Sequence, residues 1–131
     1  MKRLLLCCLF SLNAVVSHTL INYHHVKDAL EENRTPAVLG FVFACSHLDA
    51  AFKSVSTHVH KNMDITVCVL MEGCHATIFI ENDSGDCIVD FFSSDDRFTS
   101  KTFKKKLDHF LQCTSSKKIH INRGKEFSFS K

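Results

Sequence analysis

The sequence lacks several features that would place it in a familiar class. It has no apolar run of the roughly 20 residues that a helix needs to cross a bilayer. It also lacks a glycine-rich phosphate loop, a Gly-x-Ser-x-Gly elbow and a His-Glu-x-x-His motif. No internal repeat or low-complexity block interrupts it. We therefore expect one small globular domain without a membrane-spanning segment.

The chain also lacks an excess of charge of either sign. Its 16 basic and 14 acidic residues give a formal net charge of +2, and two of the basic residues, Lys2 and Arg3, stand at the very start. The remainder is formally neutral. Nucleic-acid binding needs a basic field that displaces counterions from phosphates. We therefore expect no nucleic-acid partner.

The first 17 residues have the pattern of a signal peptide. Lys2 and Arg3 form a short basic region, residues 4–10 are apolar, and Val15 and Ser17 are small residues before the expected cleavage site. Cleavage after Ser17 would lead to secretion through the endoplasmic reticulum, whose lumen is a less favoured final location because no retrieval sequence ends the chain. A buried N-terminal helix or a retained anchor is the alternative. The expected divisions are a signal peptide (1–17), a domain (18–113) and a polar, loosely ordered tail (114–131).

Seven cysteines raise the question of disulfides. Cys7 and Cys8 lie in the predicted signal peptide, so five others remain in the domain. These five are Cys45, Cys68, Cys74, Cys87 and Cys113. An odd number in an oxidising compartment means that one thiol stays unpaired, is buried, or bonds another chain. A disulfide-linked dimer is therefore one of the open alternatives.

Two Asn-x-Ser/Thr sequons make Asn33 and Asn82 candidate glycosylation sites of a secreted glycoprotein. Pro36 follows the first sequon directly and weakens it. The second lies in the polar cluster 82–85, which contains a glycine and is typical of an exposed turn. Because sequons often occur by chance, each asparagine is either glycosylated or part of a chance match to the sequon.

Hydrophobic periodicity predicts an alternation of helices and strands. Helical spacing of apolar residues favours three helices, and nearly unbroken apolar runs favour two strands buried on both faces. Two further apolar runs flank a polar loop and predict an antiparallel hairpin. The predicted helices cover residues 22–32, 47–60 and 99–112, and the predicted strands cover 37–44, 64–71, 76–81 and 87–92.

This order of elements resembles the thioredoxin fold. The run from Phe41 to Cys45 resembles the strand that leads to the family's redox motif, and the run from Ala76 to Ile80 is similar to its cis-proline strand. The lysine-rich segment 103–111 resembles the family's last helix. The resemblance implies an α/β, thioredoxin-like three-layer sandwich with a central mixed sheet of about four strands flanked by helices. The chain is shortened between the second buried strand and the hairpin.

The resembling redox motif is incomplete. Cys45-Ser46-His47-Leu48 stands where the family has two cysteines, so Leu48 replaces the resolving thiol. Ala76 occupies the position of the cis-proline. Dithiol exchange requires both an attacking thiolate and a resolving thiol. The sequence therefore indicates a degenerate redox site.

The resemblance also implies that the loop at Cys45 lies beside the loop at Cys74. The two loops would then form a binding cleft, whose residues are Ser46, His47, Leu48, Cys74, His75 and Ala76. Three alternatives are open there: a Cys45–Cys74 disulfide, a zinc site of two thiolates and two imidazoles, and unlinked residues. Cys87 and Cys113 are candidates for a further disulfide. We expect no bound metal and no cofactor.

Three functions remain in competition. The leading one is a secreted, non-catalytic thioredoxin-like domain that binds another protein through this cleft. The second is a single-cysteine thiol oxidoreductase, in which Cys45 has a lowered pKa because it stands at the N-terminus of a helix. The third is a small secreted effector or ligand of unrelated fold.

Overall fold

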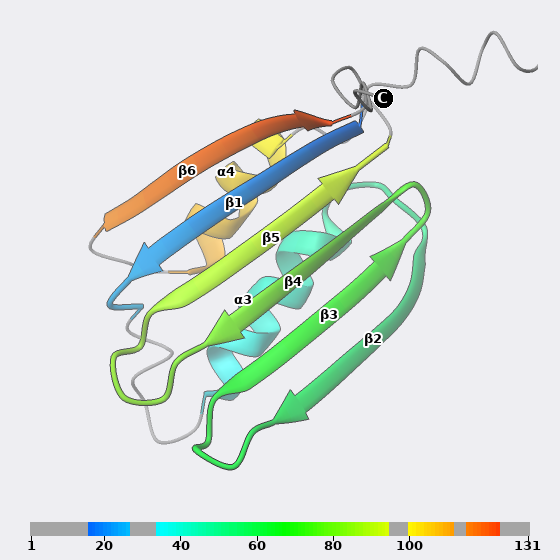
Figure 1. The fold of residues 1–131 in the computed structure, drawn as a ribbon. Helices are drawn as coiled ribbons and strands as arrows, with labels where there is room; N and C mark the ends of the chain where they lie inside the picture. Colours follow the sequence, from blue (N-terminus) through cyan, green and yellow to red (C-terminus); the bar gives the residue numbers. More distant parts are fainter. Residues whose placement is uncertain (1–15, 27–33, 95–99, 112–114, 124–131) are drawn as a thin grey trace, which may run out of the picture.

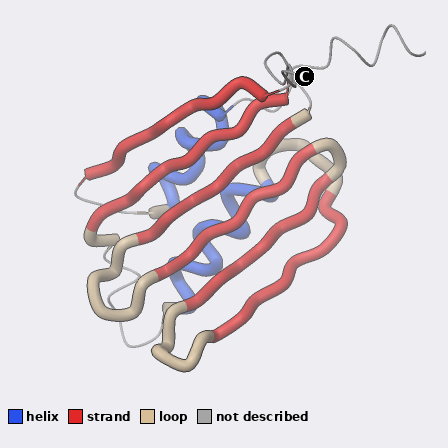
Figure 2. The backbone as a smooth tube through the Cα atoms, viewed as in Figure 1, coloured by secondary structure: helices blue, strands red, loops and turns tan. Residues whose placement is uncertain are grey.

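One six-stranded antiparallel sheet dominates the described part of the protein, and the two described helices pack against it (Figures 1 and 2). A computed structural model describes residues 16–26, 34–94, 100–111 and 115–123. The strand order across the sheet is β2-β3-β4-β5-β1-β6. The elements are β1 (Val16–His24), α3 (Thr35–Ser46), β2 (Phe52–Val59), β3 (Ile65–Met71), β4 (Cys74–Ile80), β5 (Cys87–Ser93), α4 (Ser100–Phe110) and β6 (Ser115–Arg123).

The meander β3-β4-β5 forms where the sequence predicts strands. Every second residue of β4 is buried and the residues between are half-buried, which is the pattern of a sheet with one covered face. Gly73 joins β3 to β4 at φ 76°, and Gly85 lies in the next turn at φ 69°. A residue without a Cβ adopts this left-handed backbone at little cost. The predicted strand 64–71 and the predicted hairpin are confirmed.

The helix predicted over 99–112 is confirmed as α4. Phe103 and Leu107 are fully buried one turn apart, as expected for an amphipathic helix. The ring of Phe103 stacks on Phe91 of β5 with 4.5 Å between centroids. Asp108 accepts a hydrogen bond from the Tyr23 hydroxyl of β1 at 2.9 Å. These contacts join α4 to the middle of the sheet.

The strand predicted over 37–44 is wrong, because this segment forms the middle of helix α3. Its buried residues recur at helical intervals of three and four positions. They are Ala37, Gly40, Phe41, Ala44 and Cys45. Pro36 stands in the first turn of the helix, where its fixed φ fits and its missing N–H leaves no bond unmade.

Three other segments also differ from expectation. The helix predicted over 47–60 is the edge strand β2, and the start of the helix predicted over 22–32 belongs to β1. Residues 27–33 of that predicted helix lie outside the described residues. The tail expected to be loosely ordered contains β6, which pairs with β1 along its whole length.

The thioredoxin-like sandwich is therefore wrong as a description of this protein. The described sheet is wholly antiparallel and has six strands, not a mixed sheet of about four. Both helices lie on the same side of it, which makes two layers instead of three (Figure 1). The core lies between the sheet and the helices, with Ile21, Tyr23, Phe41, Ile78, Phe91 and Phe103 among its fully buried side chains.

The predicted signal peptide lies almost wholly outside the described residues, which begin at Val16. Its expected cut after Ser17 falls two residues inside β1. Those two residues pair with Arg123 and Asn122 of β6. Within the described residues, no helix is long and apolar enough to cross a membrane.

Candidate functional site

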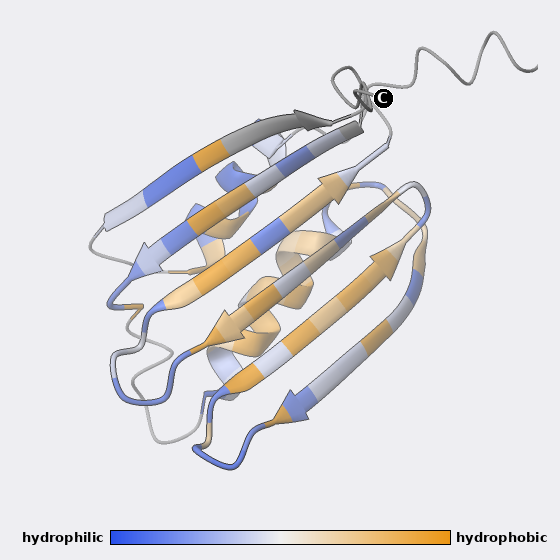
Figure 3. Cartoon of the chain, viewed as in Figure 1, coloured by the Kyte–Doolittle hydropathy of each residue, from blue (hydrophilic) through white to orange (hydrophobic). Residues whose placement is uncertain are grey.

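The side of the sheet that faces away from α3 and α4 is the candidate functional surface, and we call it the open face. Figures 1 and 3 look onto it, with the helices behind the strands. Apolar residues are spread across all the inner strands of this face and onto β6. They are Leu20, Leu70, Phe79, Ile88, Phe92 and Ile119, each half-buried or exposed. No described element covers them.

A polar and aromatic cluster lies on the open face where β1, β5 and β4 are adjacent, toward the end of the sheet at which β1 and β4 begin and β5 ends. Phe92 of β5 pairs with His18 on the neighbouring strand β1 and with His75 on the neighbouring strand β4. The ring of His75 stacks on Phe92 with centroids 4.8 Å apart and an interplanar angle of 17°. His18 meets the same ring edge-on at 6.4 Å. One phenyl ring thus holds two imidazoles in place.

The cluster contains one polar atom whose hydrogen bonding is incomplete. Nε2 of His18 is hydrogen-bonded to Oδ1 of Asp90, and a carboxylate can only accept, so Nε2 carries the proton. The other ring nitrogen, Nδ1, is buried and has no partner among the described residues. Buried polar atoms in proteins are nearly always satisfied. Nδ1 of His18 is therefore a buried polar atom without a hydrogen-bond partner among the described residues.

The residues predicted to form a cleft do not line one surface, although Leu48, Cys74 and Ala76 are buried in the same core cluster as Cys45. Ser46 ends α3 and His47 follows it, and both are exposed. On β4 the side chains of Cys74 and Ala76 face the helices and are buried, whereas His75, between them, lies on the open face. Leu48 is buried in the core. Cys74 and His75 therefore lie on opposite sides of the sheet.

Cys45 is close to the end of α3, so it does not stand at a helix N-terminus. Burial raises the pKa of its thiol well above the ordinary value, and the neighbouring thiols of Cys74 and Cys68 raise it further. Cys45, Cys68, Cys74 and Cys87 are all present as thiols, and Cys113 lies outside the described residues. The described residues contain no group of three or more side chains able to hold a metal ion.

Because Cys45 is buried, we expect its thiol to react slowly with alkylating reagents. We expect iodoacetamide at neutral pH to label Cys45 in the native chain far more slowly than in denaturant, because the attacking thiolate is scarce and shielded. Half-buried Cys68 is the internal reference, and peptide mapping by mass spectrometry separates the two sites. Labelling of native Cys45 at the rate of the denatured chain would contradict the buried position.

Of the two sequons, Asn82 lies in the turn between β4 and β5, as the sequence predicts. Its backbone N–H donates to Oδ1 of Asp64 at 2.9 Å, and its side-chain nitrogen donates to Oδ1 of Asp83 at 3.3 Å. Asn33 lies outside the described residues. Glycosylation of either site stays a prediction.

The same turn is held by Asp86, whose pKa is lowered. The largest cause is the hydrogen bond that the backbone N–H of His25 donates to its carboxylate, at 3.1 Å. The His24 imidazole, 3.2 Å from the other oxygen, lowers the pKa further. Asp86 therefore ties the end of β1 to the start of β5 as a carboxylate.

Sequence reasoning missed this cluster on the open face. Cleavage after Ser17 would leave His18 as the first residue, and the run from His18 to Tyr23 shows no alternation of polarity because Leu20 and Ile21 are both apolar. Asp90 was visible inside the correctly predicted strand 87–92. A carboxylate in the middle of an apolar strand needs a hydrogen-bond or ion-pair partner if it is removed from water.

Comparison with known proteins supports the corrected fold. No protein-family model matches the sequence, and no curated protein matches it. Among solved structures, the chain is similar to the crystal structure of the adenosylmethionine decarboxylase from Aquifex aeolicus, with a TM-score of 0.71 and 16% sequence identity. The match covers 90% of this chain and 98% of that one. This protein therefore has a fold similar to that of the A. aeolicus adenosylmethionine decarboxylase, and the thioredoxin family is excluded as its structural relative.

Proposed function

We propose that this chain is a protein-binding domain that works through the open face of its sheet, and that its partner on this face is a second copy of the chain. The observation that carries the proposal is the uncovered set of apolar residues around His18, Asp90 and His75. Antiparallel sheets often keep one face in water, but such a face usually alternates to polar residues. Here the outward positions of β3 to β5 include Leu70, Ile88 and Phe92.

A second copy suits this surface for geometric reasons. Two sheets pack face to face at about 10 Å with interdigitating side chains. A two-fold axis would bring the same patch of each chain together, which is how most soluble dimers form. The contact would cover the exposed side chains of Leu70 and Ile88.

A matched pair of leucines tests the proposal. Leu70 lies on the open face and is 47% exposed, whereas Leu39 lies on α3 and is 45% exposed. We expect sedimentation equilibrium to give the mass of two chains for the wild type and for Leu39→Glu. Leu70→Glu should give the mass of one chain, because the variant would bury a carboxylate in the contact.

The two variants separate the outcomes cleanly. Circular dichroism first establishes that both remain folded, as substitutions at half-exposed positions should. A wild type that sediments as one chain at all concentrations would contradict the proposal. So would a Leu70→Glu variant that stays as dimeric as Leu39→Glu.

Export belongs to the same proposal, on the support of the signal-peptide pattern in residues 1–17. N-terminal sequencing of the chain collected from the medium of secreting cells is the direct check. A first residue of His18 would fit the expected cut. A chain retained in the cell with Met1 intact would refute export and leave the dimer proposal standing.

Decarboxylation of adenosylmethionine, the activity named for the structural neighbour, is a second candidate function. It is favoured by the nearly complete coverage of that neighbour, although one fold commonly hosts many activities. The discriminating assay is release of labelled carbon dioxide from carboxyl-labelled adenosylmethionine by the purified chain. Release above that of a heat-denatured sample would support this candidate, and its absence would remove it.

A further inference from the structure

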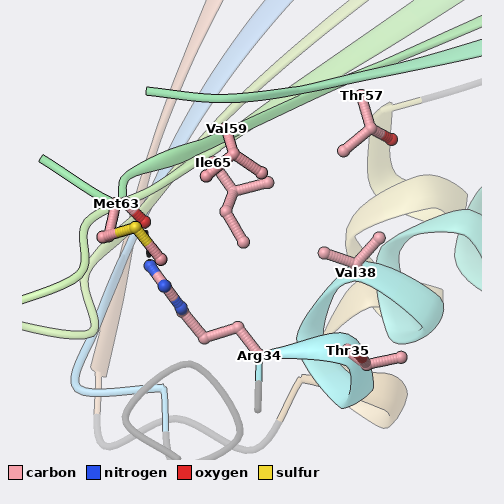
Figure 4. A pocket seen from close by; sticks show the side chains of 7 residues that line it. All are labelled: Arg34, Thr35, Val38, Thr57, Val59, Met63 and Ile65. Carbon is pink, nitrogen blue, oxygen red and sulfur yellow. Dashed lines mark hydrogen bonds between the residues drawn. The ribbon is translucent and has the colours of Figure 1, made fainter. Parts of the chain in front are cut away.

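A second site lies on the other side of the sheet, at the start of α3. Arg34 immediately precedes this helix and is only 8% exposed. Its Nη1 donates a hydrogen bond to the backbone carbonyl of Met63, in the turn between β2 and β3 (Figure 4). No carboxylate of the described residues pairs with it. A guanidinium has five N–H donors and keeps its charge at every physiological pH, and among the described residues only the carbonyl of Met63 accepts a hydrogen bond from it.

Arg34 forms one end of a pocket of about 330 Å³ between α3 and the β2–β3 hairpin. Figure 4 shows its side chain extending from the helix toward Met63, with Val59 and Ile65 coming from the strands and Val38 from the helix. The complete lining is Arg34, Thr35, Val38, Thr57, Val59, Met63 and Ile65. The pocket is therefore apolar along its walls and cationic at one end, and its volume is at the lower end of the range for small-molecule sites.

The helix adds to the positive potential at the same end. The first turn of α3 begins at Thr35, and the side chain of Arg34 makes no capping hydrogen bond to it. The N-terminus of a helix carries a partial positive charge that favours anions. A buried cation and a helix N-terminus thus coincide at one side of an apolar pocket.

We propose that this pocket binds a small amphiphilic monocarboxylate. The carboxylate would accept charge-assisted hydrogen bonds from Arg34, whose planar fork suits two parallel bonds to one carboxylate. The apolar body of the ligand would lie against Val38, Val59 and Ile65. Binding would place a carboxylate beside this buried guanidinium, which no described carboxylate pairs with, and buried charges in proteins are normally paired.

Three probes test the two halves of this chemistry on the full chain. Hexanoate has both the charge and the apolar body, acetate has only the charge, and hexan-1-ol has only the body. In amide-resolved NMR titrations we expect hexanoate to shift the signals of Val38, Val59 and Ile65. It should bind at least about tenfold more tightly than either partial probe, because hexan-1-ol lacks the charged hydrogen bonds and acetate lacks the apolar body that the pocket walls bury.

Two kinds of variant assign the binding to the pocket. Arg34→Met keeps a long apolar stem and should lose at least about tenfold in hexanoate affinity. Val59→Glu brings a carboxylate to the pocket wall, and Val55→Glu makes the same change on the same face of β2 outside the lining; these valines are 51% and 45% exposed. We expect Val59→Glu to lose binding and Val55→Glu to keep it.

The variant pair on β2 decides the question even if Arg34→Met fails to fold. Equal affinity for hexanoate and hexan-1-ol would overturn the proposal, because the charge would then contribute nothing. Wild-type affinity in Val59→Glu would overturn it as well, and so would the absence of hexanoate binding at millimolar concentration.

Discussion

Replacing Phe103 by alanine should destabilise the protein by about 3–5 kcal/mol, the largest effect of any single truncation that we expect. Phe103 is fully buried. Its ring stacks on Phe91 of β5 at 4.5 Å and meets Phe41 of α3 edge-on at 6.4 Å. The side chain therefore holds together both helices and the sheet, and its removal leaves a cavity where all three meet.

Urea unfolding followed by circular dichroism measures this loss. Phe43→Ala is the matched control, because Phe43 is also on α3 but is about half exposed, and its ring lies beside that of Phe110 at the end of α4. We expect the control to cost about 1 kcal/mol or less. Equal losses for the two variants would contradict the described packing of α4 on the sheet.

Gly40→Val should be the second most damaging change, at about 1–3 kcal/mol. Gly40 lies on the side of α3 that packs against the end of α4. A Cβ at this position would be 3.1 Å from the carbonyl oxygen of Phe110 and 3.4 Å from the Cβ of Phe110. The first of these contacts is with backbone, which cannot rotate away, so the valine would push the helices apart.

Two controls separate this steric effect from helix propensity. Gly40→Ala should cost much less, because the gain of about 1 kcal/mol from removing a helical glycine offsets its tight contact. Leu39→Val, on the exposed side of the same turn, measures the cost of a β-branched residue alone. Similar free energies of unfolding for Gly40→Val and Leu39→Val would show that α3 and α4 do not approach as described.

Strands and helices with a clear contrast between their two sides could be predicted from the sequence. The β4–β5 hairpin has a polar, glycine-containing turn at residues 82–86 between two apolar runs, and the structure confirms it. Helix α4 alternates buried Phe103 and Leu107 with lysines, so its period was visible. In each case the covered side and the solvent side differ in chemistry.

Helix α3 could not be recognised by that contrast, because its outer side is apolar too. Leu39 and Phe43 are about half exposed, while Phe41 and Ala44 are buried. An apolar run without contrast fits a buried strand as well as a helix. Pro36, which stands in the first turn of α3, is the sequence signal for a helix start.

The edge strands β2 and β6 could not be predicted from the sequence for a different reason. All residues of β2 are exposed, so the positions of its apolar residues do not indicate which side of the strand is covered. Their spacing matches that of a helix by chance. The start of β6 is Ser-Ser-Lys-Lys, which reads as a polar tail. Edge strands commonly carry lysines because these prevent pairing with other chains. The candidate site was lost with the fold, since Cys45 and His75 were joined only through the thioredoxin resemblance.

Residues 35–46 are helical and residues 52–59 extended, and the two faces of the sheet and both proposed sites follow from this assignment. Backbone chemical-shift assignment of the full chain tests it most directly. We expect Cα chemical shifts typical of a helix throughout residues 35–46 and of extended backbone throughout residues 52–59. Extended shifts over 37–44 together with helical shifts over 47–60 would contradict it.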